Sequence, residues 1–406
     1  MDTALTRSQF VRWRLAIFAI FLASGLSIST WASRVPSIKD DLTLDNAQVG
    51  LILLGMGVAS IIGISTGPAV MARTGARRGM LVTMLAFATG IVLIGLGSTV
   101  FVSVPVVLLG MALFGFGNGS VDVMMNVEAT AIEQQMGKTI LPVFHAFFSF
   151  GTVIGAGIGA LAAGAGLSVA THAAIMGALI AVIAVTCFFQ VPVREAALDA
   201  ADEKPHWRER MHVALEAWRE PRTYMLGVVM LGMSFAEGGA NDWIALGAEE
   251  GHGAPAGMGA VALATFSVGM TVVRLFGGPV VDRFGRVLVL RLLAVTAAAG
   301  ILLFILAPTL PLVLLGAALW GVGASLGFPI GMSAAADDPA KAAARVSAAA
   351  TIGYVAFLGG PPVLGMISAH IGLLNTLFIL VALVIASGLF SGAARPLRAD
   401  ETTATK

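Results

Sequence analysis

The amino-acid sequence predicts an all-α membrane protein with twelve transmembrane helices in two six-helix halves. Three observations lead to this prediction. The chain of 406 residues is 57% hydrophobic and only 12% charged, about half the charged fraction of a soluble protein. Its apolar runs are about 20 residues long, enough for a helix to cross a bilayer and too long and apolar for the strands of a membrane barrel. A motif in the first half of the chain also recurs in the second.

Glycine–proline pairs and charged clusters interrupt the apolar runs and mark the ends of the spans. The predicted spans are 13–33, 47–71, 79–99, 104–127, 140–164, 168–191, 223–247, 257–281, 287–307, 311–334, 346–369 and 372–393. Their even number places both termini on one side of the membrane. Most of the 24 lysine and arginine residues lie in the terminal tails or in loops on that side, so the positive-inside rule predicts cytoplasmic termini.

A polar segment separates the two halves. We predict an N-terminal half at 1–192, a cytoplasmic linker at 193–222 and a C-terminal half at 223–406. Within the linker, apolar side chains between Trp207 and Trp218 recur at helical spacing among arginines. This pattern is typical of a helix on the membrane surface, and equally of a tether whose tryptophans anchor at the interface.

Two strings recur between the halves. Residues 67–78 contain an altered copy of residues 278–286, with the Gly-Pro pair, an arginine and a glycine kept and one residue inserted. Residues 108–117, Leu-Leu-Gly followed by spaced glycines, return as residues 314–323. Each copy occupies the same place relative to the spans. The last six spans are therefore predicted to repeat the first six in the same orientation.

The string Gly-x-x-x-Asp-Arg-x-Gly-Arg at 278–286 resembles the signature between the second and third helices of a half in the major facilitator superfamily. The resemblance covers the whole chain and implies a transporter with a central cavity between the halves. The motif contributes candidate gating residues: Gly278, Asp282, Arg283 and Arg286, with Arg73 from the first copy. Ala72 replaces the aspartate in the first copy, so a symmetric latch on the cytoplasmic side is not expected.

Each motif residue has a physical reason for its place. Gly278 is expected to let two helices approach closely. Asp282 can accept from a neighbouring helix N-terminus or pair with a basic residue of the other half. Arg283 and Arg286 are expected to hold the loop at the cytoplasmic surface.

Polar side chains within the spans are the candidate solute-binding and proton-coupling residues, because a charge in the hydrocarbon costs roughly 2.5–3.5 kcal/mol or more. They are Asn118, Asp122 and Asn126 in the fourth span, His145 in the fifth, and Glu237 and Asn241 in the seventh, with Trp31 and Trp243 near the ends of the first and seventh. In the superfamily the first, fourth, seventh and tenth spans line the cavity. The alternative is that the polar groups only join helices to one another.

Depth along the spans predicts which of these residues meet. At about 1.5 Å per residue, Asp122 and Arg274 each lie roughly 25 Å from the periplasmic end of their span, with His145 near the same layer. Glu237 lies roughly 20 Å from the cytoplasmic end of its span. We therefore expect a cytoplasmic-side gating cluster of Asp122, His145 and Arg274, with Glu237 above it. The alternative is that Arg274 pairs with Asp282.

The leading functional prediction is a secondary transporter that moves a small polar or sugar-like solute together with protons by alternating access. Asp122, Glu237 and His145 can exchange protons, and Trp31 and Trp243 could stack on a sugar face. The sequence is similar to bacterial permeases near the fucose–proton symporters, which implies the inner membrane, although the first span has no acid. A proton-coupled exporter, a uniporter, a sensor and a lipid flippase are the alternatives.

Several functional classes are not expected. The glycine strings inside the spans neither follow a strand nor precede Lys-Ser/Thr, so they indicate helix packing and not a nucleotide site. No nucleophile–base pair or metal-ligand spacing occurs, and the single cysteine excludes an internal disulfide. We predict a monomer that binds a small-molecule substrate, protons and the lipid bilayer, without nucleic acid, cofactor, metal or enzyme activity.

Overall fold

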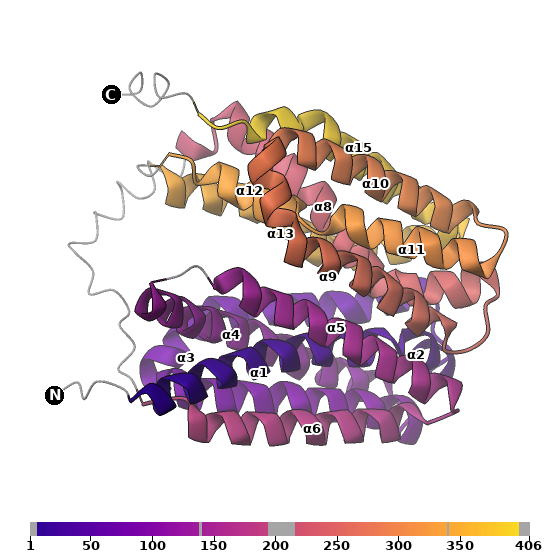
Figure 1. The fold of residues 1–406 in the computed structure, drawn as a ribbon. Helices are drawn as coiled ribbons and strands as arrows, with labels where there is room; N and C mark the ends of the chain where they lie inside the picture. Colours follow the sequence, from indigo (N-terminus) through magenta and orange to yellow (C-terminus); the bar gives the residue numbers. More distant parts are fainter. Residues whose placement is uncertain (1–5, 138–139, 194–215, 339–340, 398–406) are drawn as a thin grey trace. The chain divides into compact units, whose positions relative to one another are not determined.

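A computed structural model describes residues 6–137, 140–193, 216–338 and 341–397, and within these ranges all regular structure is helical (Figure 1). The chain divides into two compact units. The first unit comprises the described residues of 1–198 together with 242–267, and the second those of 199–241 together with 268–406. The predicted linker helix from Trp207 lies almost entirely outside the described residues.

The helices of the first unit are α1 (Arg7–Ala32), α2 (Val35–Asp41), α3 (Asn46–Gly95), η1 (Leu96–Val100), α4 (Val104–Met136), α5 (Leu141–Gly164) and α6 (Val169–Gln190). Those of the second are α10 (Arg286–Leu306), α11 (Leu310–Ala324), α12 (Gly327–Ala335), α13 (Ala342–Ile371), α14 (Leu373–Thr376), α15 (Phe378–Phe390) and η3 (Ser391–Ala394). Helices α8 (Pro221–Leu246) and α9 (Met258–Phe284) begin in one unit and end in the other, and η2 (Gly247–Gly251) belongs to the first.

The twelve predicted spans are confirmed once α3 is divided. Nine helices in the described part of the chain are long and apolar enough to cross a membrane. Helix α3 counts once among them, but Gly75 interrupts it with φ 74° and ψ 155° and separates the second span from the third. Helices α8 and α13 supply the remaining two spans. Each predicted span therefore corresponds to one helical segment.

Side-chain caps and prolines set where several helices begin. The Thr6 side chain accepts from the backbone of Gln9 in a capping box before α1, and Asp45 does the same with Gln48 before α3. Proline stands in the first turn of α4, α5 and α11, where its missing N–H leaves no bond unmade. Gly137 in the left-handed conformation ends α4.

Glycine contacts show that the two units repeat one packing scheme. A Cβ on Gly90 would lie 2.6 Å from the carbonyl oxygen of Gly110, and a Cβ on Gly316 would lie 2.9 Å from that of Gly300. These pairs join the third span to the fourth and the ninth to the tenth. Gly285, at φ 79° and ψ 155°, has nearly the same backbone conformation as Gly75. The internal repeat read from the sequence is thus also present in the structure.

Residues 242–267 belong to the first unit because they pack against its other helices. Lys39 Nζ lies 2.6 Å from Glu250 Oε1, and a Cβ on Gly257 would lie 3.1 Å from the backbone nitrogen of Gly164 at the end of α5. The boundaries predicted at 192 and 223 concern the duplicated halves, and they stay a prediction.

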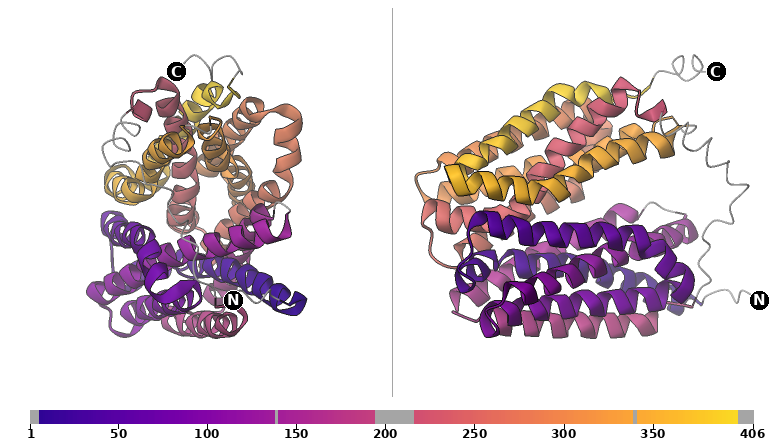
Figure 2. Two further views of the ribbon diagram at one scale, coloured as in Figure 1. Left: turned by 90° about the vertical axis from the view of Figure 1, so that its left-hand side faces the viewer. Right: turned by 180° about the vertical axis from the view of Figure 1, so that it is seen from behind.

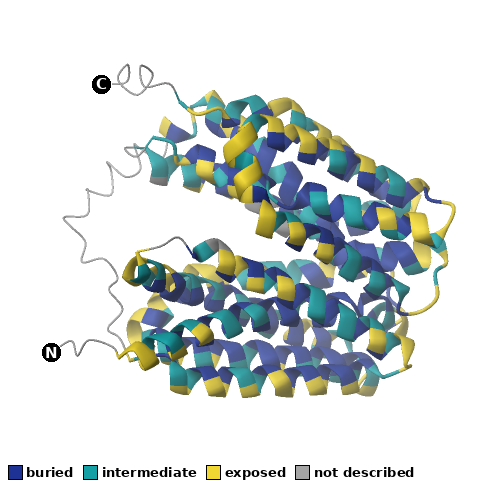
Figure 3. Cartoon of the chain, in the orientation of Figure 1, coloured by how far each residue is buried: buried dark blue, intermediate teal, exposed yellow. Residues whose placement is uncertain are grey.

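Apolar side chains cover much of the outer surface of each unit. The helices of the first unit run side by side along most of their length (Figure 2). Exposed positions recur along their outer faces between buried ones (Figure 3). Leu161 is 76% exposed, Phe189 69% and Val295 67%. Such surfaces are stable where lipid tails replace water.

Candidate functional site

An ion pair between α8 and α9 is the central feature of the second unit. Arg274 Nη2 lies 2.8 Å from Glu237 Oε1 and 2.9 Å from Oε2, and both side chains are only 17% exposed. Arg274 Nε also donates to the carbonyl oxygen of Ser325 at 3.1 Å. The guanidinium therefore fixes α9 to two other spans at once.

Ser325 can accept this bond because the tenth span is broken beside it. Helix α11 ends at Ala324 and α12 starts at Gly327, which leaves carbonyl groups without helical partners. On the preceding turn, the Trp320 indole donates to the carbonyl oxygen of Ala236 at 2.9 Å. A broken helix, a part-buried ion pair and a buried tryptophan thus meet around Glu237. In transporters built from repeats, interrupted helices of this kind commonly form the binding site.

The ion pair places Glu237 level with Arg274, whereas Glu237 was expected above it. The helical path of α8 continues through η2 to Gly251, so Glu237 lies roughly 21 Å from that end. Arg274 lies roughly 24 Å from the start of α9 at Met258. Since the two helices run in opposite directions from that end, the residues are nearly level. The predicted span ends at 247, short of Gly251, and for this reason Glu237 was expected above Arg274.

The expected gating cluster of Asp122, His145 and Arg274 stays a prediction. Within the second unit the carboxylate that pairs with Arg274 is Glu237, where the alternative was Asp282. Asp282 is exposed and makes no hydrogen bond or ion pair with the described residues of its unit. His145 is exposed on α5, where its ring packs edge-on against Phe21 at 5.2 Å.

The polar stripe predicted in the fourth span is present on α4. Asn126 Nδ2 donates to the backbone oxygen of Asp122 at 2.8 Å and to its carboxylate at 3.3 Å. The Oδ1 atom of Asn118 is buried and has no hydrogen-bond partner among the described residues. The stripe therefore carries an acid whose described hydrogen-bond donor comes from its own helix, and an amide oxygen with unused capacity.

The two tryptophans proposed to stack on a solute are both buried, and their role stays a prediction. Trp31 is 3% exposed and lies edge-on to Phe114, and Trp243 is 0% exposed. Asn241 remains half-buried on α8. Its neighbour Asp242 is 8% exposed, with no hydrogen bond or ion pair to its carboxylate among the described residues. An acid in an apolar span was the signal that could have added Asp242 to the candidates.

The motif at 278–286 differs in detail from the prediction. Nothing lies within 4 Å of a Cβ placed on Gly278, whereas one on Gly277 would lie 2.6 Å from Leu326 Cδ1. The close approach is therefore made by Gly277. Arg286 Nη1 lies 2.6 Å from Asp337 Oδ1, and Arg222 Nη2 lies 2.9 Å from the other oxygen of that carboxylate.

The remaining motif arginines are less constrained than Arg286. Arg283 is exposed and lies over the ring of Phe284 at 5.4 Å. Arg73 of the first copy is exposed and makes no ion pair within the described part of its unit. Their predicted gating roles stay predictions.

Comparison with known families gives this arrangement its context. The family model of the Major Facilitator Superfamily matches residues 15–261 and 243–406. The chain belongs to the Major Facilitator Superfamily. It is therefore a multi-pass membrane transporter.

Three relatives are similar to this chain along most of their length. The chain is 30% identical over 385 residues to the uncharacterised transporter y4wD of Sinorhizobium fredii, which covers 94% of this chain and 97% of the relative. It is 29% identical over 382 residues to an uncharacterised MFS-type transporter of Yersinia pestis, with 93% of each chain covered. Membrane protein MosC of Rhizobium meliloti is 26% identical over 374 residues, with 91% and 88% covered.

Solved structures of superfamily members have the same fold. A mutant of the nucleoside transporter NupG matches with a TM-score of 0.76 at 16% identity, covering 95% of this chain and 99% of that chain. The transporter FucP matches with a TM-score of 0.67 at 16% identity, covering 96% and 100%. At this identity the likeness concerns the fold alone.

Proposed function

We propose that this superfamily transporter is a proton-coupled symporter of a small polar solute, acting as a monomer in a bacterial inner membrane with both termini in the cytoplasm. The observation that carries the proposal is the ion pair between Glu237 and Arg274 beside the break in the tenth span. Two charges that are mostly buried inside membrane-spanning helices are costly unless they stay paired. Their presence there favours a role that needs both charge states.

Proton binding to Glu237 would release Arg274. A carboxylate that accepts a proton loses its attraction for the guanidinium, which then seeks another acceptor. A solute hydroxyl, carbonyl or carboxylate would supply that acceptor, since a guanidinium presents several donors. The cation would thus bind solute only when the acid carries a proton. This linkage between solute binding and proton binding is what symport requires.

The polar stripe on α4 supports a polar solute. Asp122, Asn126 and the unsatisfied amide oxygen of Asn118 provide acceptors and donors suited to hydroxyl groups. Two of the solved structures of the same fold also have names that mention such solutes, a nucleoside transporter and a fucose–proton symporter. These names belong to those proteins, and they guide the choice of test compounds here.

Uptake into proteoliposomes tests the proposal. The purified protein is reconstituted and offered a panel of radiolabelled pentoses, hexoses, nucleosides and sugar acids, with and without an inward proton gradient. We expect the gradient to drive accumulation of at least one class. The variant Glu237→Gln should lose gradient-driven accumulation while retaining exchange of solute across the membrane. Asp40→Asn, which changes an exposed acid without an ion pair among the described residues, is the matched control.

Three outcomes would overturn the proposal. Uptake that is insensitive to the gradient would identify a uniporter. Accumulation driven only by a proton gradient of opposite direction would identify an antiporter and hence an exporter. Unchanged coupling in Glu237→Gln would remove the ion pair from the coupling mechanism.

A further inference from the structure

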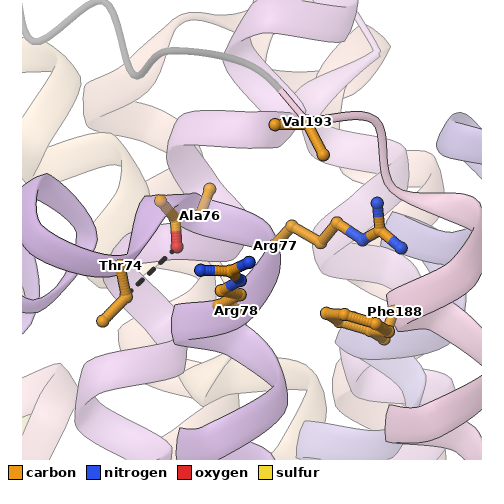
Figure 4. Close-up of a pocket in the computed structure, with 7 residues that line it drawn as sticks. Thr74, Ala76, Arg77, Arg78, Phe188 and Val193 are labelled. Atoms are coloured by element: carbon orange, nitrogen blue, oxygen red, sulfur yellow. Dashed lines mark hydrogen bonds between the residues drawn. The ribbon is translucent and has the colours of Figure 1, made fainter.

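The turn between the two parts of α3 borders an open hollow in the first unit. Its volume is about 360 Å³, and its walls are Thr74, Gly75, Ala76, Arg77 and Arg78 from the turn, with Phe188 of α6 and Val193 just after α6 (Figure 4). We propose that this hollow binds the phosphate group of an anionic phospholipid.

The arginines of the hollow lack a carboxylate partner in the described part of the chain. Arg77 lies over the ring of Phe188 at 4.2 Å, and its Nε atom is buried without a hydrogen-bond acceptor. A buried donor without a partner destabilises the protein, and more so when it is charged. Arg78 is exposed at the same rim. The two guanidinium groups together offer donors and charge to an oxyanion.

The second copy of the motif shows what the first copy lacks. There Arg286 is bound to Asp337, which Arg222 also contacts. In the first copy no ion pair to Arg77 or Arg78 occurs among the described residues. An external anion would supply the negative charge that the protein itself supplies in the second copy.

The position of the hollow favours a lipid over a soluble anion. Exposed apolar side chains run along the outer face of α6 up to the hollow: Ile175, Leu179, Val182, Val185, Phe189 and Val193. The first five recur at helical spacing and form a lipid-facing stripe, and Val193 follows just after the helix. Phe189 is 69% exposed and Val193 is 82% exposed. An acyl chain lying against this stripe would bring its phosphate to the arginines, where basic pockets between helices bind lipid headgroups.

The backbone of the turn leaves room for such a headgroup. Gly75 has a positive φ of 74°, and nothing lies within 4 Å of a Cβ placed on it. The Thr74 hydroxyl lies at the rim, 3.3 Å from the backbone oxygen of Gly75 (Figure 4). The Thr74 hydroxyl donates to the backbone oxygen of Val70 at 2.8 Å, so the two guanidinium groups are the donors available to a phosphate.

Lipid retention in nanodiscs tests the proposal. The full-length protein is assembled with equal amounts of phosphatidylglycerol and phosphatidylcholine, and native mass spectrometry measures the lipids that remain after gentle release. We expect several-fold enrichment of phosphatidylglycerol in the wild type. The double variant Arg77→Gln, Arg78→Gln should lose this enrichment. Arg73→Gln removes an exposed arginine of the same turn that does not line the hollow, and it should keep the enrichment.

A second variant guards against misfolding. Arg77→Lys, Arg78→Lys keeps both charges and should keep at least part of the enrichment. Equal loss in Arg73→Gln would show a general surface charge effect and overturn the proposal. Inorganic phosphate that stabilises the detergent-solubilised wild type, with no phosphatidylglycerol enrichment, would assign the hollow to a soluble phosphate instead. Retention that appears only after Glu195, Asp199, Asp202 and Glu203 are neutralised would show that the chain fills its own hollow.

Discussion

Removing one member of the Glu237–Arg274 pair should destabilise the second unit strongly. In Arg274→Met the carboxylate of Glu237 loses two hydrogen bonds, at 2.8 and 2.9 Å, while remaining 17% exposed. The carbonyl oxygen of Ser325 loses the bond from Arg274 Nε. Breaking a buried ion pair from one side costs about 3–5 kcal/mol. For a chain of 406 residues this corresponds to a fall in Tm of about 4–6 °C.

A double-mutant cycle that combines Arg274→Met with Glu237→Gln separates the effect of charge from the effect of packing. Glu237→Gln leaves a neutral acceptor for Arg274 and should cost less, about 1.5–3 kcal/mol. The double variant carries no unpaired charge, so its loss should be smaller than the sum of the two single losses by about 0.5–3 kcal/mol. Thermal unfolding in detergent, followed by tryptophan fluorescence, measures all three variants. Arg12→Met, at an exposed position of α1, is the control and should stay within about 0.5 kcal/mol of wild type.

Two results would refute this reasoning. A Tm of Arg274→Met equal to that of Arg12→Met would mean that the pair does not hold the helices together. Strictly additive effects of Arg274→Met and Glu237→Gln would mean that the two side chains do not interact in the folded protein.

Two further predictions concern the first unit and the helix crossings. Burial raises the pKa of Glu249, against the effect of hydrogen bonds from the backbone of Gly257 and Gly259. Since the folded state then favours the protonated acid, Glu249→Gln should raise Tm at pH 8, and this gain should shrink as the pH falls and be lost below the ordinary pKa of a glutamate. A gain that is independent of pH would contradict this assignment. Gly300→Ala would place a Cβ 2.3 Å from the backbone nitrogen of Trp320 in the tenth span, whereas a Cβ at Gly157 meets nothing within 4 Å. Only Gly300→Ala should therefore lower Tm, because it reduces the free energy of unfolding by about 1–3 kcal/mol. Equal Tm values for the two variants would show that the helices move apart freely to accept the methyl group.

The spans and their turns could be predicted because their causes are local. A run of apolar residues must form a helix in lipid, and a glycine at a basic turn permits the positive φ that Gly75 and Gly285 both adopt. The repeat strengthened both predictions. These features need no knowledge of which helices are neighbours.

Side-chain partners could not be predicted in the same way. The partner of Arg274 depends on where α8 ends, and its helical path continues to Gly251, past the predicted end of the span. The direction of a side chain in an apolar helix is equally hidden, because helices that are apolar on all sides give no amphipathic signal. For this reason Trp31 and Trp243 were expected at a cavity and are buried, and Gly278 was expected at the contact that Gly277 makes.

The duplicated halves differ most in how their charged side chains are paired. This difference suggests a division of tasks between them in proton coupling. The second unit holds paired charges, Glu237 with Arg274 and Arg286 with Asp337. In the polar stripe on α4 of the first unit, the described side-chain donor to the Asp122 carboxylate is the amide of Asn126. If both halves carried the same ion pair, proton binding would weaken both pairs equally. Neither half could then be assigned to the solute or to the proton. On our proposal the second unit responds to the proton and the amide-rich stripe of the first binds the solute. Asp122→Asn should therefore weaken solute binding in exchange assays while Glu237→Gln abolishes only the dependence on the proton gradient. Identical phenotypes in the two variants would show that the halves do not divide these tasks.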